Sequence, residues 1–364
     1  MSKPIIFSFF SGSGFLDLGF EKAGFNVAFV NEYQASFMEA YKYSREKMGM
    51  PKPEYGEYLG DINDLLTQEH KGPFLKKVQA AQKKALVGFI GGPPCPDFSV
   101  GGKNKGEHGE NGALTRSYVE VIIEFKPDFF VFENVKGLWR TKKHREFYDR
   151  MKDILSKEYD LTDRLTNCIE YGAPQDRDRI FLFGIKKSLG ADLSKFPWEH
   201  TIKHDRELVL KKSPWPSTMG EQLFEPNSID DWQRKLTVEY WFNKNDVENH
   251  PNSKHHFTPR SGLAKFQIIK EGDVSKKSYK RLHRYRYSPT AAYGNNEVHL
   301  HPLYPRRLSA AEAMAIQSLP KEFELPASMT LTDMFKTIGN GVPFLAAKGL
   351  AQTIEKFLLQ LDIK

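Results

Sequence analysis

A repeated order of strand-like and helix-like segments constrains the fold of this chain more than any other feature. The apolar residues 5–10 are rich in strand formers, and a turn that contains Gly12 and Gly14 follows them. Helix-like spacing of apolar residues comes next over 15–20, and a second apolar run covers 25–30. This order predicts a strand, a glycine turn, a helix and a second strand, which together form a βαβ unit.

The same order recurs downstream, where 86–90 and 129–132 are short apolar runs that break into polar loops. Strands that alternate with helices predict an α/β fold with a doubly wound, mainly parallel sheet. In such sheets ligands bind beyond the carboxyl ends of the strands. The residues Gly12, Glu32, Cys95 and Glu133 follow the four apolar runs. We therefore expect all four to face one crevice.

The regular pattern stops near residue 186 and returns after residue 300. The stretch between is rich in Pro, Asn, His, Lys and Trp and shows no sustained periodicity. Helical spacing resumes at 309–314, behind a capping-box sequence, and again at 342–361. Three parts are predicted: a larger domain of residues 1–190, an inserted smaller and irregular domain of residues 191–300, and a segment of residues 301–364 that returns to the first domain.

The charge balance favours a polyanionic partner. Lys and Arg number 53 against 46 Asp and Glu, and the formal net charge of +7 suits nucleic acid. The apolar runs are shorter than the ~18 residues that a membrane-spanning helix needs. We expect a cytoplasmic protein with reduced cysteines and no membrane association. The pairs His255-His256 and His299-x-His301 lack cysteine partners, so we expect no metal.

The glycine turn can be compared with the dinucleotide-binding pattern G-x-G-x-x-G. The third glycine would fall at position 17, where Asp17 stands instead, so a pyrophosphate cradle and a nicotinamide dehydrogenase are disfavoured. With Glu32 at the end of the next strand, the turn suits a nucleoside whose ribose hydroxyls bind the carboxylate. S-adenosylmethionine has this shape. The alternative is a turn that only joins a strand to a helix.

Cys95 and Glu133 have the chemistry of a covalent mechanism. Cys95 lies between Pro94 and Pro96, a stiff and exposed setting in which a thiol can act as a nucleophile. A buried, inert cysteine is the alternative, and Cys168 fits that description. Glu133 follows four apolar residues, which are expected to raise its pKa and keep a proton available. A simple strand-end acid is the alternative for Glu133.

A polar segment at 171–179 lies between two further apolar strands. Strand-like alternation would place Gln175, Arg177 and Arg179 on one side, where the arginines could hold a phosphate or a base oxygen. The alternative is a ladder of surface salt bridges with Asp176 and Asp178.

These blocks, in this order, resemble the cytosine-5 DNA methyltransferases over nearly all of the chain except the irregular domain. The matching blocks are Phe10-Ser11-Gly12-Ser13-Gly14, Glu32, Gly60-Asp61-Ile62, Pro94-Cys95, Glu133-Asn134-Val135, Gln175-x-Arg177-x-Arg179, residues 307–317 and Gly339-Asn340-Gly341-Val342-Pro343. Pro96 stands where the family usually has Gln. The resemblance implies the class I S-adenosylmethionine-dependent methyltransferase fold, with the irregular domain as the target-recognition domain.

The resemblance also implies a reaction. Cys95 would add to carbon 6 of a flipped-out cytosine in a specific sequence of double-stranded DNA, and S-adenosylmethionine would methylate carbon 5. Glu133 would protonate ring nitrogen 3, and Arg179 would hold the base oxygen, with Arg177 in the same catalytic motif. The compact chain resembles a prokaryotic restriction-modification enzyme that protects DNA from a cognate endonuclease, and we expect a monomer.

Two groups of binding residues complete these expectations. The family's cofactor pocket maps onto Phe10, Gly12, Gly14, Glu32, Asp61, Ile62, Pro94, Leu114 and Asn340. DNA contacts are expected from the loop after Cys95 and from the basic, aromatic run at 276–287, through Ser99, Lys103, Lys105, Lys280, Arg281, Arg284 and Arg286. Solvated surface segments are the alternative for both.

Two other functions remain open at the level of sequence. A tRNA cytosine-5 methyltransferase would keep the chemistry but carry a small recognition domain, whereas more than ~100 residues separate Arg179 from Arg307 here. A non-catalytic DNA-binding relative would have lost its nucleophile or its cofactor residues. Cys95, Glu133 and Glu32 are all present, so we favour the DNA methyltransferase.

Overall fold

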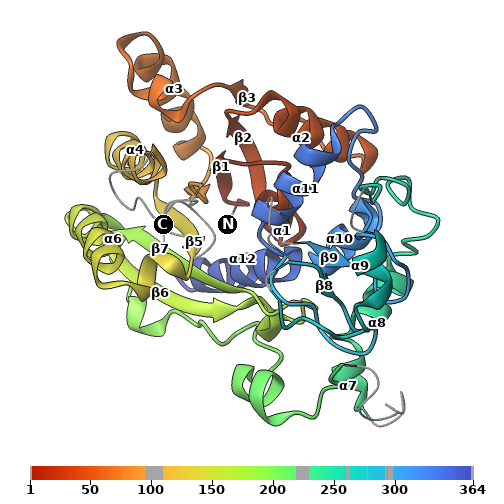
Figure 1. Cartoon of the computed structure of the whole chain (residues 1–364). Helices are drawn as coiled ribbons and strands as arrows, with labels where there is room; N and C mark the ends of the chain where they lie inside the picture. Colours follow the sequence, from red (N-terminus) through yellow and green to blue (C-terminus); the bar gives the residue numbers. More distant parts are fainter. Residues whose placement is uncertain are drawn as a thin grey trace.

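The computed structural model describes residues 2–94, 110–218, 229–259, 263–276, 278–291, 293 and 298–361. Within them a seven-stranded sheet has the order β3-β2-β1-β4-β5-β7-β6 (Figure 1). Its strands are β1 (Ile5–Phe9), β2 (Asn26–Glu32), β3 (Gly56–Leu59), β4 (Val87–Gly91), β5 (Phe129–Val135), β6 (Tyr159–Asn167) and β7 (Asp178–Lys186). The neighbours among β1 to β5 pair in parallel, whereas β7 runs antiparallel to β5 and β6. The predicted mainly parallel sheet is confirmed.

Helices cover both faces of the sheet, because its strands bury side chains on both sides. In β1, Phe7 and Phe9 point to one face and Ile6 points to the other. The first face packs against α3 (Gln68–Gln82), α4 (Glu110–Phe125) and α6 (Lys142–Leu155). The second face packs against α1 (Phe15–Lys22), α2 (Ala35–Lys47) and α12 (Phe344–Leu358). The sheet is therefore doubly wound, as predicted.

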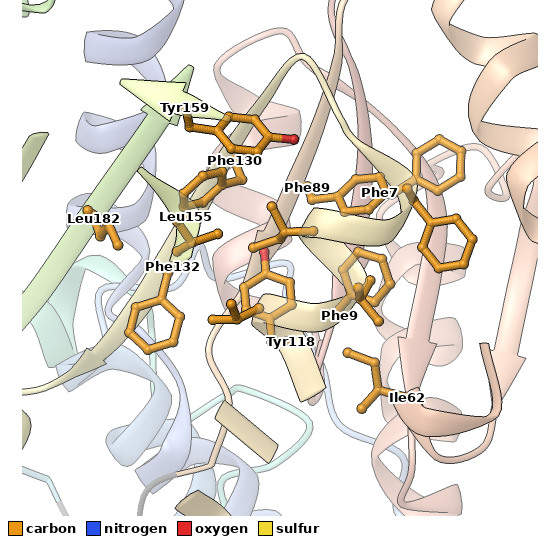
Figure 2. Packing of buried hydrophobic residues seen from close by; sticks show 14 of the residues in the cluster. Phe7, Phe9, Ile62, Phe89, Tyr118, Phe130, Phe132, Leu155, Tyr159 and Leu182 are labelled. Atoms are coloured by element: carbon orange, nitrogen blue, oxygen red, sulfur yellow. The ribbon is translucent and has the colours of Figure 1, made fainter. Parts of the chain in front are cut away.

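Aromatic rings fill the first of these two layers. Figure 2 shows Phe7, Phe9, Phe89 and Tyr118 gathered between strands and helices, and the Phe9 and Phe89 ring centroids lie 5.0 Å apart. The hydroxyl of Tyr118 on α4 donates a hydrogen bond to the Val131 carbonyl of β5 over 2.9 Å. These contacts fix the strand ends relative to one another, because close-packed rings leave little room for a strand to slide.

Strand β5 is longer than its apolar run predicts. The sequence suggests that the strand breaks at Glu133, but the pairing with β7 continues from Phe129 opposite Ile185 to Val135 opposite Arg179. The antiparallel neighbour supplies hydrogen-bonding partners beyond the apolar run, so the polar residues stay in the strand. Glu133 is therefore held on a sheet rather than in a loop.

The described part of the inserted stretch contains short elements. They are α7 (Asp231–Arg234), α8 (Val238–Lys244), α9 (Leu263–Ile268) and the paired strands β8 (Lys280–Arg281) and β9 (His299–Leu300). Residues at its start lie elsewhere: Phe196 and Trp198 pack beside Phe183 of β7 and Phe357 of α12. The first residues assigned to the irregular domain thus contribute to the core of the larger domain.

The returning segment joins the two parts of the molecule. It contains α10 (Ala310–Ile316), behind the predicted capping box at Ser309, and α11 (Leu331–Asn340). One side of α10 packs with Leu18 of α1, and the other packs with Trp241 of α8. In Figure 1, α10 and α11 lie between the sheet domain and the shorter helices α8 and α9. A last short helix, α5 (Gly137–Arg140), follows β5.

Candidate cofactor and catalytic site

The expected crevice residues that the structure describes lie at the carboxyl ends of four neighbouring strands. Phe10 follows β1, Glu32 ends β2, Pro94 comes shortly after β4, and Glu133 lies near the end of β5. These strands are adjacent in the order β2-β1-β4-β5. Cys95, Ser99, Lys103 and Lys105 lie outside the described residues.

The glycine turn after β1 is bonded directly to the acid at the end of β2. Its φ angles are positive at Phe10 (53°), Gly12 (56°) and Gly14 (80°). The Gly12 amide donates to Glu32 Oε2 over 2.7 Å, and the Gln34 amide donates to Glu32 Oε1 over 2.8 Å. Burial raises the pKa of Glu32, and these two amides partly oppose that effect. The Tyr33 amide acts in the same direction. Two carboxylate oxygens accept about four hydrogen bonds together, so the group keeps capacity for a further donor.

The final helical segment returns to this turn. Thr337 on α11 places its Oγ1 atom 2.7 Å from Ser13 Oγ, and the Ser13 amide donates to the same atom over 3.3 Å. Asn340, at the end of α11, is exposed. The segment around Asn340 is therefore anchored at the glycine turn, although the sequence analysis did not single out Thr337.

The loop after β3 is drawn toward the end of β2. The Asn31 side chain donates to the Gly60 carbonyl over 2.9 Å, and the Gly60 amide donates to the Glu32 carbonyl over 3.0 Å. Asp61 then caps a short helix at 62–66 by accepting from the Asn63 amide over 2.8 Å. Ile62 is buried in the aromatic layer. Asp61 and Ile62 thus follow directly on a residue that is bonded to Glu32.

Aromatic and apolar side chains border the same region. Phe10 and Leu114 are partly buried at the edge of the aromatic layer, where the Phe10 ring meets the edge of the Tyr118 ring at 6.0 Å. Tyr33, directly after Glu32, is 74% exposed. The sequence analysis missed Tyr33, although an aromatic residue beside a strand-end acid is visible in the sequence.

Glu133 and Arg179 form a buried ion pair across two strands. Arg179 Nε lies 2.7 Å from Glu133 Oε1, with side-chain exposures of 8% and 10%. Burial raises the pKa of Glu133, and the positive charges of Arg179 and Arg177 oppose this rise. The pair can exist here because antiparallel β7 brings Arg179 opposite Val135, two residues beyond Glu133. The ion pair thus brings together two residues that the sequence analysis singled out.

Gly92 carries the backbone past this ion pair on the way to Cys95. A Cβ atom at Gly92 would lie 2.6 Å from Glu133 Oε2, closer than two non-bonded atoms can approach. The backbone between β4 and Pro94 therefore packs directly against the carboxyl group. The last described residues before Cys95 therefore start beside Glu133.

Gln175 and Arg177 are buried beside one another just before β7, which begins at Asp178. Arg177 Nη1 donates to Gln175 Oε1 over 3.3 Å. Arg177 Nη1 donates to the Ala291 carbonyl over 2.6 Å, and Nη2 donates to the Gly339 carbonyl over 2.7 Å. Gln175 donates to Gln317 Oε1 over 3.0 Å. These side chains connect distant segments of the chain, and the sequence analysis missed Gln317.

The arginines of the basic run are partly used inside the irregular domain. Arg281 is 4% exposed, and its guanidinium donates to backbone carbonyls of Phe266, Ile269, His301 and Tyr304. Arg284 binds both oxygens of the Glu271 carboxylate over 3.0 and 3.2 Å. Lys280 and Arg286 are partly exposed. The sequence shows that basic residues are dense here. It does not show which of them bind groups inside the domain and which are partly exposed.

Two further observations concern the described residues only. No helix among them is long and apolar enough to cross a membrane. Within the same residues, no three His, Cys, Asp or Glu side chains gather into a group that could hold a metal ion.

The sheet has the fold of the class I S-adenosylmethionine-dependent methyltransferases. A protein encoded within an E. coli prophage and described as a DNA modification methyltransferase superposes with a TM-score of 0.68 at 22% identity, over 99% of this chain and 100% of that one. The S. pombe Dnmt2 methyltransferase gives a TM-score of 0.59 at 14% identity, over 99% and 100%.

Sequence comparison gives the family. Residues 5–356 match the C-5 cytosine-specific DNA methylases. Type II methyltransferase M.NmeDI of Neisseria meningitidis serogroup C is 59% identical over 360 residues, which are 98% of this chain and 84% of that protein. Type II methyltransferase M.FnuDI of Fusobacterium nucleatum is 28% identical over 97% of this chain and 94% of its own length. The chain therefore belongs to the C-5 cytosine-specific DNA methylase family and is a DNA (cytosine-5-)-methyltransferase.

Proposed function

We propose that this enzyme transfers the methyl group of S-adenosylmethionine to carbon 5 of a flipped-out cytosine in a specific duplex DNA sequence, through a covalent adduct with Cys95. The observation that carries the proposal is the buried Glu133–Arg179 ion pair, against which Gly92 packs three residues before Cys95. A buried carboxyl group with a raised pKa, held by an arginine, is suited to protonate a ring nitrogen.

The donor set at the ends of β1, β2 and β3 fits S-adenosylmethionine. Glu32 has lone pairs for the ribose hydroxyls, Asp61 can accept from the adenine amino group, and exposed Tyr33 can cover the ring. We assign cofactor contacts to Phe10, Gly12, Gly14, Glu32, Asp61, Ile62, Pro94, Leu114 and Asn340. When bound, the cofactor supplies an electrophilic methyl group.

The chain's own residues would activate the cytosine ring. Carbon 5 is a weak nucleophile, and addition of the Cys95 thiolate to carbon 6 converts the ring to an enamine that can attack a methyl group. Glu133 gives a proton to nitrogen 3 as the sulfur–carbon bond forms, and Arg179 holds the base oxygen and the Glu133 carboxylate. Loss of the carbon 5 proton to a base then restores the ring double bond and expels the Cys95 thiolate, and the nitrogen 3 proton returns to Glu133.

Recognition of DNA is assigned to the irregular domain of residues 191–300 and to the loop after Cys95. A flipped base costs a few kcal/mol, which contacts to the duplex must supply. We assign these contacts to Ser99, Lys103, Lys105, Lys280, Arg284 and Arg286, and we leave out Arg281 because backbone carbonyls take its donors. The relatives are named Type II methyltransferases, and on this basis we propose that the enzyme protects DNA from a cognate endonuclease. We place this role in the cytoplasm.

The test is methyl transfer from labelled S-adenosylmethionine to mixed duplex DNA and, separately, to bulk tRNA. Wild type is compared with Cys95→Ala and with Cys168→Ala, which removes the buried second thiol. We expect label in duplex DNA from wild type and Cys168→Ala, and none from Cys95→Ala. A duplex with 5-fluorocytosine should trap wild type as a covalent complex stable to denaturation, because fluorine cannot leave carbon 5 as a cation.

Other outcomes would contradict the proposal. Label in tRNA alone would assign the enzyme to RNA. Full transfer by Cys95→Ala would remove the covalent mechanism. A wild-type protein that binds duplex DNA but transfers no label to either nucleic acid would be a binding protein rather than an active methyltransferase.

A further inference from the structure

A buried arginine outside the expected site contacts the far side of the glycine turn. Arg45 on α2 is 4% exposed. Its Nη1 atom donates to the Ser13 carbonyl over 3.0 Å, and its Nη2 atom donates to the Gly14 carbonyl over 2.6 Å. Nη2 also lies 3.0 Å from Glu21 Oε2, and the guanidinium stacks 4.2 Å above the Tyr41 ring.

The turn is packed against this guanidinium without spare room. Gly14 has a φ of 80°, and a Cβ atom there would lie 2.5 Å from Arg45 Nη1 and 2.6 Å from Tyr41 Cδ2. Glycine is therefore required at position 14 by the arginine beneath the turn as well as by the backbone angle. The turn cannot move toward α2 while Arg45 is in place.

Three elements hold the turn from three directions. Glu32 on β2 accepts from the Gly12 amide, Thr337 on α11 bonds to Ser13, and Arg45 on α2 holds two successive carbonyls. Among these three contacts, only Arg45 brings a charged donor. Its guanidinium holds the carbonyl oxygens of Ser13 and Gly14. Charge-assisted bonds from a planar guanidinium are stronger and more directional than neutral ones.

We propose that Arg45 is a positioning residue for cofactor binding, which clamps the Ser13 and Gly14 carbonyls so that the glycine turn is preorganised for S-adenosylmethionine. The inference rests on the proposed function, because it takes the turn as the cofactor site. Glu21 balances the charge of the buried guanidinium and orients it. The ligand then does not have to order the turn when it binds, and this lowers the free-energy cost of binding.

The test separates cofactor binding from simple stabilisation of the fold. Arg45→Lys keeps the positive charge, but a lysine ammonium cannot bridge two carbonyls and a carboxylate in the same plane. Lys42→Met serves as a control on the same helix, since Lys42 is 51% exposed and pairs with Glu57 at the surface. We measure the dissociation constant of S-adenosylmethionine by calorimetry, KM for cofactor and for duplex DNA, kcat, and the thermal midpoint.

We expect Arg45→Lys to weaken cofactor binding roughly 10-fold, with a parallel rise in the cofactor KM, while kcat and the DNA KM stay near wild type. Lys42→Met should leave all five measured values unchanged. If Arg45→Lys does not fold, Glu21→Gln carries the test, with the same direction and a smaller effect.

Two results would overturn the inference, and they can be told apart. A lower thermal midpoint with an unchanged dissociation constant would show that Arg45 only stabilises the fold. A wild-type protein that does not bind S-adenosylmethionine would overturn the proposed function itself, and that result appears before any variant is compared.

Discussion

Single residues at the catalytic site meet two opposing electrostatic demands. Glu133 must be buried enough for its pKa to rise, yet it must also be held by Arg179, whose charge lowers the pKa. Removal of one partner from a buried ion pair typically costs ~3–5 kcal/mol, since the other charge is left without compensation. Gly92 adds a steric limit, because its backbone packs against the Glu133 carboxylate and leaves no room for a side chain.

Gly92→Ala is predicted to impair catalysis through Glu133. The new methyl group would lie 2.6 Å from Glu133 Oε2, so the carboxylate must move and its contact with Arg179 must lengthen. We expect kcat for methyl transfer to fall about 100-fold, since misplacement of a proton donor by ~1 Å has effects of this size. Binding of duplex DNA and S-adenosylmethionine should change little. Steady-state kinetics with separate binding measurements check this.

Gly72→Ala is the matched control for Gly92→Ala. Gly72 lies on α3, and a Cβ atom there would meet nothing within 4 Å. This control should keep wild-type kcat. If Gly92→Ala also kept wild-type kcat, the packing of the β4 loop against Glu133 would have no catalytic consequence.

At the scale of elements, apolar periodicity predicted the strands well where packing determines them. The run 5–10 became β1, and the run 86–90 became β4 at 87–91. The same reasoning ended β5 too early, because the antiparallel partner that extends it lies some 45 residues downstream in the sequence. Local patterns predict where a strand lies. Pairing with a neighbouring strand determines where it ends, and so whether polar residues at its end belong to it.

In the candidate site too, local sequence patterns identify some residues, whereas contacts between distant segments determine others. Glu32, Glu133 and Arg179 could be predicted because their positions at strand ends and in motifs are visible in the sequence. Thr337 and Gln317 could not, since each acts through a contact with a segment more than ~100 residues away.

Gln317→Leu is predicted to loosen the contact between α10, α11 and the β6–β7 connection. The buried Gln317 side chain accepts from Gln175 and donates to the carbonyls of Ile338 and Gly341. Leucine would remove the Gln317 donor from the Ile338 and Gly341 carbonyls, which costs about 1–3 kcal/mol for each buried group left unsatisfied. The Gln175 amide nitrogen would keep only its contact with the Ile316 carbonyl. We expect the free energy of unfolding in urea to fall by at least ~2 kcal/mol. Exposed Gln360 on the chain after α12 gives the control Gln360→Leu, and equal losses for both variants would contradict the prediction.

At the scale of the whole molecule, one buried acid links the fold to pH. Asp17 on α1 is fully buried, accepts from Ser8 of β1 over 2.8 Å through Oδ1, and has no partner for Oδ2. Burial raises the pKa of Asp17 from 3.8 to about 7, although Arg45 opposes the rise. The folded protein thus keeps a proton that the unfolded chain loses above about pH 4.

The stability that this proton contributes is fully present below the unfolded pKa of 3.8 and is lost as the pH rises through about 7. Asp17→Asn cannot ionise, so its free energy of unfolding relative to wild type should rise by about 3 kcal/mol between about pH 5 and about pH 8, at ~1.36 kcal/mol for each pKa unit. Urea unfolding at both pH values measures this difference, with Glu46→Gln, at an exposed position on α2, as the control. The prediction is wrong if the free energy of unfolding changes equally with pH in wild type and in Asp17→Asn. Asp17 would then have the same pKa in the folded and the unfolded chain.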